Sequence, residues 1–234
     1  MSVRTAVIIA GGRGLRLGPY TQNLPKPMIR LLGKPLLQWV VEWLVKERIG
    51  KIVIGVAYKK ESVMNYFRDG KEFGIEIIYS NHKIESDTGG AFKLAMRNGG
   101  VNDKFFLAMN GDELTNVSLE NFSTFHRQNG GIATILAAPL RSNFGVINLN
   151  SHNVVTSFDE KPIIDSKFVS AGVYMFSREI YDYLPEKGSI ERETFVRLAE
   201  ERKLRAFRYF GFWRTVNTIK DIEIAEKELH SVWG

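Results

Sequence analysis

Short apolar runs rich in β-branched residues alternate with segments of helical spacing along the first half of the chain. The runs lie at residues 5–10, 52–57, 75–79 and 105–109, and each has the length and character of a buried parallel strand. Apolar residues recur at helical spacing over 36–45, and shorter stretches of this kind separate the later runs. This alternation predicts an α/β fold, with a doubly wound sheet that carries helices on both faces.

From residue 132 onward the strand signals crowd together and helical segments become fewer. Strands are expected at 132–138, 146–149, 154–158 and 169–176, and helices near 177–184, 191–201 and 220–229. We interpret this half as mixed sheet that closes over the first half. No linker, internal repeat or low-complexity segment marks a boundary, so we expect a single domain over 1–234 whose two halves meet near residue 112.

Composition limits the class of protein further. With 234 residues, of which 44% are hydrophobic and 25% charged, the chain suffices for one substantial domain. The absence of cysteine excludes disulfides, cysteine-based zinc sites and thiol nucleophiles, and favours a cytoplasmic location. No apolar run approaches the roughly 18 residues of a spanning helix, and the first run is shorter than a signal-peptide core. We therefore expect a soluble cytoplasmic protein without a membrane partner.

The formal net charge of +6 could serve nucleic acid or small anionic ligands. The basic residues are scattered and often adjoin acidic ones, as in Glu200-Glu201-Arg202-Lys203, and no stripe of interleaved basic and aromatic residues is present. Small anionic ligands explain this charge as well as nucleic acid does, and without such a stripe we expect no nucleic-acid partner.

A glycine-rich segment, Ala10-Gly11-Gly12-Arg13-Gly14-Leu15-Arg16-Leu17, follows the first predicted strand. Ligands bind at the carboxyl edge of an open α/β sheet, and glycines there let backbone N–H groups approach phosphate oxygens. The segment is not the dinucleotide fingerprint, because Leu17 stands where the third glycine belongs, and no Gly-Lys-Ser/Thr follows to make a Walker loop. Glycines alone do not separate a phosphate loop from an ordinary turn.

Two further segments add charged groups to this edge. In Pro25-Lys26-Pro27 the prolines restrict the backbone, so Lys26 is presented at a fixed position where its ammonium suits electrostatic catalysis. Asp112 follows the strand predicted at 105–109 in a glycine turn, where a carboxylate suits Mg²⁺. The alternative for Asp112 is a turn residue that caps its own backbone.

Together these segments resemble the sugar-1-phosphate nucleotidyltransferases, whose hallmark is a Gly-Gly-x-Gly-Thr-Arg-Leu loop followed by Pro-Lys-Pro and a second Lys-Pro. The sequence carries the loop at 11–17, Pro25-Lys26-Pro27 and Lys34-Pro35. The resemblance continues in order through Asp87-Thr88-Gly89-Gly90-Ala91, Asn110-Gly111-Asp112, Phe144-Gly145, Glu160-Lys161-Pro162, Ala171-Gly172-Val173-Tyr174, Ile190-Glu191 and Gly211-Phe212-Trp213. It implies a Rossmann-like three-layer αβα fold with a mixed, mainly parallel central sheet. The β-helix domain that many relatives append is not expected here.

The resemblance also implies a reaction and its partners. A sugar 1-phosphate of the hexose or heptose class attacks the α-phosphorus of a nucleoside triphosphate, and pyrophosphate leaves. By similarity, Arg16 holds the β- and γ-phosphates, Lys26 contacts the α-phosphate during attack, and Asp112 binds the cofactor Mg²⁺. Whether the chain forms a homo-oligomer stays open.

The resemblance divides the binding residues into two sets. The nucleotide set comprises Ala10, Gly11, Gly12, Gly14, Arg16, Thr88, Gly89, Gly90 and Asp112. The sugar-phosphate set comprises Gly145, Glu160, Lys161, Ala171, Gly172 and Glu191. In the second set, Lys161 is expected to pair with the sugar phosphate and Glu160 to accept hydrogen bonds from sugar hydroxyls. Without the motif context, an ordinary solvated strand end would be favoured for both.

One segment departs from the family pattern, Trp213-Arg214-Thr215-Val216-Asn217-Thr218 against Trp-x-Asp-x-Gly-Thr. Thr215 thus stands in the place of a second metal-binding aspartate. Asn217 stands where some cytidylyltransferases of the family carry an aspartate, and it is a weaker candidate Mg²⁺ ligand than Asp112. Asp87 and Ser170 also differ from the usual residues, which leaves the base and the sugar open. The alternative function is a catalytically weakened relative that binds a nucleotide sugar or a partner protein for regulation.

Overall fold

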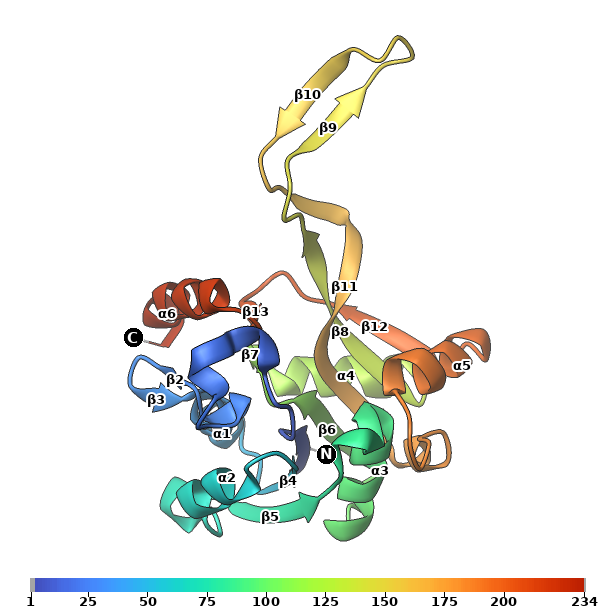
Figure 1. Ribbon diagram of the computed structural model, residues 1–234. Coiled ribbons are helices and arrows are strands. Elements are labelled where there is room, and N and C mark those ends of the chain that lie inside the picture. Colours follow the sequence, from blue (N-terminus) through green and yellow to red (C-terminus); the bar gives the residue numbers. More distant parts are fainter. Residues whose placement is uncertain (1–2, 234) are drawn as a thin grey trace.

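In the computed structural model, which describes residues 3–233, a seven-stranded sheet forms the centre of the molecule (Figure 1). β11 is antiparallel to both of its neighbours, and every other pair of adjacent strands in this sheet is parallel. The mixed, mainly parallel sheet expected from the resemblance is therefore confirmed. The strands in spatial order are β12 (Leu204–Arg208), β8 (Ala133–Arg141), β11 (Ile163–Ser177), β6 (Phe105–Asn110), β1 (Thr5–Ile9), β4 (Lys51–Val56) and β5 (Glu76–Asn81).

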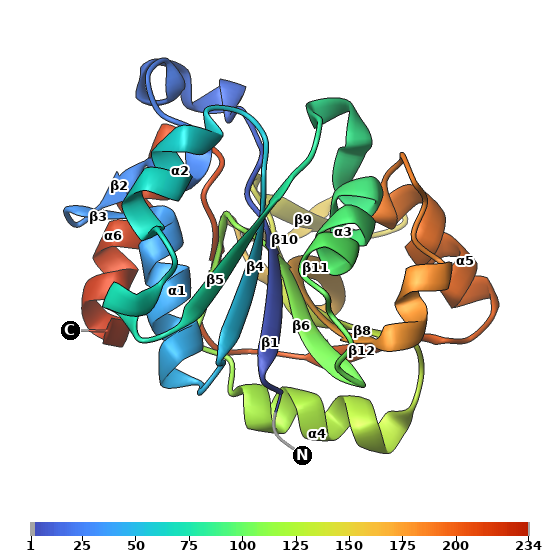
Figure 2. The same cartoon turned by 90° about the horizontal axis from the view of Figure 1, so that it is seen from below.

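Side chains of the central strands alternate between two apolar layers, as the two-residue period of a buried strand requires. Ala6 and Ile8 of β1 belong to one layer and Val7 to the other. Figure 2 shows α1, α2 and α6 on one side of the sheet, with α3 and α5 on the opposite side. The helices of the first layer are α1 (Leu36–Lys46), α2 (Lys60–Phe67), α4 (Leu119–Asn129) and α6 (Ile219–Trp233); those of the second are α3 (Asp87–Asn98) and α5 (Phe195–Glu200).

Shorter elements complete the chain. Two small antiparallel ladders join β2 to β3 and β7 to β13, and a further hairpin joins β9 to β10. None of the helices within 3–233 is long and apolar enough to cross a membrane. The short strands are β2 (Arg30–Leu31), β3 (Lys34–Pro35), β7 (Glu113–Thr115), β9 (Val146–Leu149), β10 (Val155–Asp159) and β13 (Trp213–Thr215). The short segments of 3-10 or π-helix are η1 (Leu15–Thr21), η2 (Lys26–Met28), η3 (Lys71–Phe73), η4 (Ile84–Ser86), η5 (Arg178–Asp182) and η6 (Ile190–Thr194).

Some elements differ from those expected from the sequence. Helix α4 was not predicted, because its apolar stripe is narrow; Ser118 caps its first turn by accepting from the N–H of Asn121. The helix expected over 177–184 is only the 3-10 turn η5, whose residues lead to Pro185. Strand β11 begins at Ile163, earlier than the expected 169. Its register with β8 shifts twice, between Ile164 and Phe168 and between Ser170 and Tyr174.

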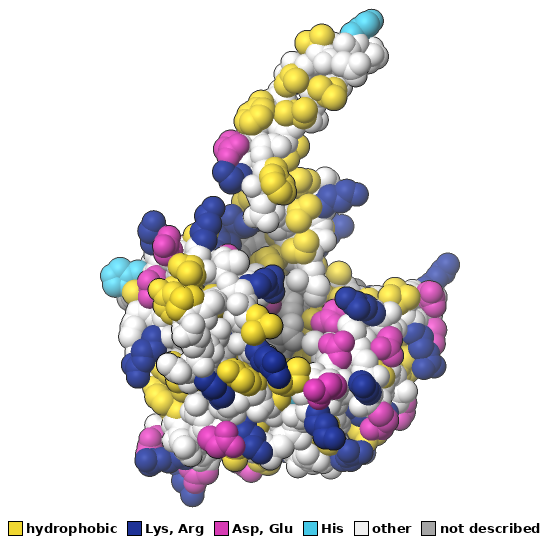
Figure 3. All heavy atoms as spheres, viewed as in Figure 1, with side chains coloured by type: hydrophobic (Ala, Val, Ile, Leu, Met, Phe, Trp, Pro, Cys, Tyr) yellow, Lys and Arg dark blue, Asp and Glu magenta, His cyan; other side chains and the backbone are white. Residues whose placement is uncertain are grey.

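Strands β8 and β11 extend beyond the sheet and lead into a projecting arm, residues 142–162, which contains β9 and β10 (Figure 1). One face of this hairpin is apolar, since Ile147 pairs with Phe158 and Leu149 with Val155. Phe158 is 65% exposed, and Figure 3 shows hydrophobic side chains along the arm. Ile147, Leu149 and Val155 are likewise exposed, so this apolar face is open to solvent. Among the described strands β9 and β10 pair only with each other.

Candidate functional site

The carboxyl ends of β1 and β6 lie side by side and bring two predicted segments together. Ile9 pairs with Asn110 in the parallel register, and the N–H of Gly111 donates to the carbonyl of Ile9 at 2.8 Å. The glycine loop after β1 and Asp112 after β6 therefore open onto the same edge of the sheet, as expected for an α/β fold. A cavity of about 620 Å³ lies at this edge. Its lining includes Ala10, Gly12, Gly14, Arg16, Lys26, Ile84, Thr88, Asp112 and Asn217.

The glycine loop requires glycine at two positions for different reasons. Gly14 has a φ of +67°, and a Cβ there would lie 2.9 Å from side-chain atoms of both Thr21 and Lys26. A Cβ at Gly11 would collide with the imidazole of His82, which packs behind the loop. Burial lowers the pKa of His82, so this ring is held neutral there. The loop can therefore pass close to both Lys26 and His82 only with glycines.

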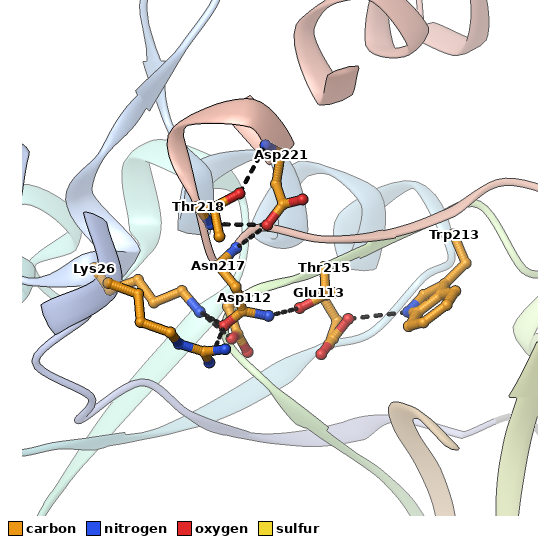
Figure 4. A network of polar contacts seen from close by, with 9 residues as sticks. Lys26, Asp112, Glu113, Trp213, Thr215, Asn217, Thr218 and Asp221 are labelled. Atoms are coloured by element: carbon orange, nitrogen blue, oxygen red, sulfur yellow. Dashed lines mark hydrogen bonds and ion pairs between the residues drawn. The ribbon is translucent and has the colours of Figure 1, made fainter. Parts of the chain in front are cut away.

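Lys26 is held at the cavity wall by the short turn η2. Pro25 is extended, with φ −71° and ψ 154°, and Pro27 occupies the first turn, so the backbone on both sides of the lysine is fixed. Although it is a lysine, Lys26 is only 8% exposed. Its Nζ forms an ion pair with the carboxylate of Asp112 and donates to Asn217 Oδ1 at 2.8 Å (Figure 4). The pre-positioned cation expected from the two prolines is thus observed.

Arg16 reaches the same group from the glycine-loop side. Its Nη2 donates to Asn217 Oδ1 at 2.9 Å, so a single amide oxygen receives hydrogen bonds from both cations. The two cations, the Asp112 carboxylate and the glycine-loop backbone all border one cavity. This arrangement suits a ligand that carries several phosphates, because fixed positive groups and backbone N–H donors meet its oxygens together.

Two oxygen donors in this cavity suit Mg²⁺. A carboxylate oxygen of Asp112 and Oδ1 of Asn217 converge on one point, where the cationic Nζ of Lys26 lies. Residues 3–233 contain no cluster of three or more His, Cys, Asp or Glu side chains able to hold a metal. Mg²⁺ usually keeps waters and binds through one or two carboxylates together with substrate phosphates. The donors present therefore fit a metal shared with a phosphate ligand.

Glu113 is a buried acid that sequence reasoning missed. It is 7% exposed, and Trp213 Nε1 donates both to Glu113 Oε2 and to the carbonyl of Ala171, each at 2.9 Å. Burial and the neighbouring charge of Asp112 raise the pKa of Glu113 well above its usual value. Its position directly after Asp112 was the one sequence feature that could have pointed to it. Its burial could not be predicted from nearby residues, because it arises from β7 pairing with β13, about 100 residues away.

Glu113 follows Asp112 of the cavity and lies beside part of the sugar-phosphate set, although it does not itself line the cavity. Gly172 has a φ of +67°, and a Cβ there would lie 2.8 Å from Glu113 Cγ. Thr215, which the sequence places at the position of a metal-binding aspartate, lies directly opposite Glu113 in the β7–β13 ladder. Ala171, Gly172 and Thr215 thus surround one buried carboxyl group.

Thr88 and Glu191 connect the two expected sets directly. Thr88 Oγ1 donates to Glu191 Oε2 at 2.8 Å and accepts from the N–H of Ile190 at 3.0 Å. Gly89 and Gly90 face residues 186–188. A Cβ added at Gly89 would lie 2.8 Å from the carbonyl oxygen of Gly188, and one at Gly90 would lie 2.6 Å from that of Glu186. These two glycines allow helix α3 to pack closely against residues 186–188, and Thr88 alone of the three lines the cavity.

The remaining sugar-phosphate residues lie apart from the cavity. Lys161 and Glu160 form an ion pair with each other at the base of the arm, and both are exposed. Gly145 lies under Phe158, whose ring atoms would be 2.6 Å from an added Cβ. None of these three residues is among those lining the cavity.

Comparison with known proteins gives consistent matches over most of the chain. The nucleotidyl transferase family model matches residues 5–231. The UTP–glucose-1-phosphate uridylyltransferase of Synechocystis is 32% identical over 77% of this chain and 50% of its own length. A mannose-1-phosphate guanyltransferase of Gibberella zeae is 32% identical over 92% of this chain and 61% of its own length. The chain thus spans about half to three fifths of these relatives.

A shorter relative and two solved structures match along nearly their whole length. The probable glucose-1-phosphate cytidylyltransferase of Bacillus subtilis is 26% identical, covering 98% of this chain and 96% of its own. A putative glucose-1-phosphate thymidylyltransferase of Bacillus anthracis, solved with sucrose, superposes with a TM-score of 0.77 at 20% identity, covering 97% and 95% of the two chains. HddC of Yersinia pseudotuberculosis, solved with GMP-PN, gives 0.74 at 23% identity, covering 97% and 100%. The solved structures support the fold.

Proposed function

Because the chain belongs to the nucleotidyl transferase family, we propose that it transfers a nucleoside monophosphate from a nucleoside triphosphate to a sugar 1-phosphate, with release of pyrophosphate. One observation carries this proposal: Arg16, Lys26 and Asp112 border one cavity beside a glycine loop. Several of the matched relatives are named for this class of reaction with different bases and sugars. A nucleoside triphosphate is an intracellular substrate, so we also propose the cytoplasm as the location.

The residues of the cavity would act mainly by position and charge. A sugar 1-phosphate oxygen attacks the α-phosphorus in line with the leaving pyrophosphate, and the transition state gathers charge on the phosphoryl oxygens. Lys26 is proposed to meet the α-phosphate and Arg16 the β- and γ-phosphates. To do so, Lys26 exchanges its bond to Asp112 for one to a phosphate oxygen, and Arg16 uses N–H donors other than the one that meets Asn217. Mg²⁺ bound through Asp112, with Asn217 as a second donor, would neutralise phosphate charge.

The nucleotide and sugar subsites extend from this centre. We propose that the backbone of Ala10, Gly11, Gly12 and Gly14, together with Thr88, contacts the nucleotide, while Gly89 and Gly90 support Thr88 through the packing of α3. Ala171, Gly172 and Glu191 are proposed to border the sugar. Glu160, Lys161 and Gly145 belong to the arm, and Gly145 is proposed to border the sugar. Lys161 is proposed to pair with the sugar phosphate by exchanging Glu160 for it, which frees Glu160 to accept from sugar hydroxyls.

The test is pyrophosphate release with each of four nucleoside triphosphates against a panel of hexose and heptose 1-phosphates, in the presence of Mg²⁺. At least one pair should give release, and Asp112→Asn should lose it. Release from no pair would contradict the proposal.

A regulatory role without turnover is the second candidate function. The observation that favours it is that neutral residues stand where a second carboxylate is expected: Asn217 lines the cavity and donates to Thr215 beside it. This candidate predicts binding of a nucleotide sugar without pyrophosphate release in any combination. Equilibrium binding of nucleotide sugars beside the release assay separates the two.

A further inference from the structure

The side chain of Asn217 connects both phosphate-facing cations to the start of helix α6. Its Oδ1 accepts from Lys26 Nζ at 2.8 Å and its Nδ2 donates to Thr215 Oγ1 at 2.8 Å (Figure 4). The same Oδ1 also accepts from Arg16 Nη2 at 2.9 Å. A reversed amide would place an NH₂ group against two cations and leave no acceptor for them. These contacts therefore fix which way the amide faces.

The backbone of Asn217 is held by a second carboxylate, that of Asp221. Asp221 Oδ2 accepts from the N–H of Asn217 at 2.9 Å and from the N–H of Thr218 at 2.8 Å. In return, Thr218 Oγ1 accepts from the N–H of Asp221 at 3.3 Å, which completes a reciprocal capping box at the N-terminus of α6. A helix cap by itself accounts for the bonds between Thr218 and Asp221. The bond to Asn217 is additional, because that residue precedes the cap.

Val216, the residue before Asn217, is also fixed, on the side of the segment that faces Asp112. The N–H of Val216 donates to the carbonyl of Asp112 at 3.1 Å, and the Val216 side chain is fully buried. Asp221 itself is not among the residues lining the cavity. Asn217 is thus held between the Val216 bond to the Asp112 backbone and a carboxylate outside the cavity lining.

We propose that Asp221 is a positioning residue for the phosphate-binding cations and acts through Asn217; this inference rests on the proposed function. When Asp221 releases the N–H of Asn217, the amide is no longer fixed, and Lys26 and Arg16 lose a shared acceptor that orients them toward the cavity. Misplacement of a charged group by even about 1 Å is enough to cost about 10²-fold in rate. The effect reaches the reacting centre without contact between Asp221 and the substrate.

The experiment compares Asp221→Ala with a matched variant, Thr218→Ala, in the pyrophosphate-release assay and in thermal unfolding. Each substitution removes one half of the capping box, so both should lower Tm by a few degrees. Only Asp221→Ala also removes the bond to Asn217. It should lower kcat about tenfold and raise KM for the triphosphate, with KM for the sugar 1-phosphate unchanged. Thr218→Ala should keep a kcat within about twofold of the wild type.

A conservative variant and a direct binding measurement separate positioning from folding. Asp221→Asn retains a side-chain oxygen that can accept from the N–H of Asn217, so it should restore kcat to within about threefold of the wild type. Calorimetric affinity for inorganic pyrophosphate should fall about fivefold in Asp221→Ala and stay unchanged in Thr218→Ala.

The outcomes are distinguishable from those of the proposed function. If the wild type releases pyrophosphate but Asp221→Ala matches Thr218→Ala in kcat and in pyrophosphate affinity, the positioning role is wrong and the proposed function stands. If the wild type binds pyrophosphate without turnover, the pyrophosphate affinities of the two variants decide the positioning role: a loss in Asp221→Ala alone supports it, and equal affinities contradict it. A wild type that neither reacts with nor binds pyrophosphate would overturn both.

Discussion

The most sharply defined residue of the site is Lys26, buried between two prolines and paired with Asp112 and Asn217. Lys26→Ala should lower kcat by about 10²- to 10³-fold, because a fixed charge that acts at the phosphoryl centre stabilises mainly the transition state. Steady-state pyrophosphate release measures this. The matched control is Lys34→Ala, since Lys34 also precedes a proline but is only partly buried and pairs with Glu42 outside the cavity. An unchanged kcat in Lys26→Ala would contradict the assigned role.

Substitution of Lys161 should change KM more than kcat. Lys161→Ala is expected to raise KM for the sugar 1-phosphate about tenfold with a smaller change in kcat, because its proposed contact is to the bound phosphate in the ground state as well. Titration of the sugar 1-phosphate at saturating nucleotide measures the change. Lys167→Ala, an exposed lysine further along β11, is the control. If both variants keep the wild-type KM, Lys161 does not bind the sugar phosphate.

His126 links single-residue chemistry to acid stability. Its ring lies buried between Thr134 Oγ1 at 2.7 Å and Ser177 Oγ at 3.0 Å, and burial lowers the pKa of His126 to about 4. The unfolded chain takes up this proton near pH 6.5, whereas the folded protein does so only near pH 4. Folding stability is therefore lost as the pH falls through this window, by about 2 kcal/mol between pH 7 and pH 5.

Urea unfolding at pH 7 and pH 5 measures this contribution. His126→Gln cannot titrate, so its stability should fall by about 2 kcal/mol less over the same interval than that of the wild type. His152→Gln alters an exposed histidine on the arm and should keep the wild-type pH dependence. Equal pH dependence in His126→Gln and the wild type would show that burial does not hold this ring neutral.

At the scale of elements, the arm and the sheet should differ in local stability. The amides of β9 and β10 pair only with each other among the described strands, and an isolated two-stranded hairpin is marginally stable in water. Hydrogen exchange should therefore be faster by orders of magnitude in 146–149 and 155–159 than in β1, β4 and β6, which are paired on both sides. If the amides of the arm were as well protected from exchange as those of β6, the arm would not be an isolated hairpin.

The elements that could be predicted from the sequence are those whose burial is determined locally. Strands β1, β4 and β6 are buried on both faces, so each gives an uninterrupted apolar run. Helix α4 has a narrow apolar stripe around Leu119 and Phe122, so its pattern is weak. Strands β7 and β13 are three residues each, and they exist because segments about 100 residues apart meet, which no local pattern records.

At the scale of the whole molecule, the predictable part of the site is the part set by topology. Arg16, Lys26 and Asp112 meet because parallel strands end at one edge of the sheet, and the motifs already place these residues after strand ends or in the adjacent loop. Glu113 is buried by a pairing between segments about 100 residues apart, so the sequence alone did not identify it. Asp221 bonds locally to Asn217, and only the long-range bonds of Asn217 to Lys26 and Arg16 bring it near the site. Glu160 and Lys161 were assigned by motif, but the long strand β11 carries them onto the arm, outside the cavity.

The same cavity determines how the whole molecule should respond to metal. The Asp112 carboxylate and the Asn217 amide oxygen converge on a common point, and residues 3–233 hold no cluster of three or more metal-binding side chains, so Mg²⁺ finds too few protein ligands there for tight binding. Mg²⁺ without nucleotide should shift Tm by no more than about 1 °C. Mg²⁺ with the triphosphate that supports turnover should raise Tm by about 5–10 °C at a hundredfold excess over Kd, because a ligand that binds only the native state stabilises it by mass action.

Thermal unfolding with EDTA, with Mg²⁺ alone, with the triphosphate alone and with both measures the coupling between metal and nucleotide. Asp112→Asn should abolish the additional stabilisation that Mg²⁺ gives in the presence of the triphosphate, since it removes the carboxylate at the convergence point and leaves neutral amide oxygens. Full stabilisation by Mg²⁺ alone would instead require a complete set of protein ligands. The convergence of a single carboxylate and a single amide on Lys26 Nζ would then be the wrong location for the metal.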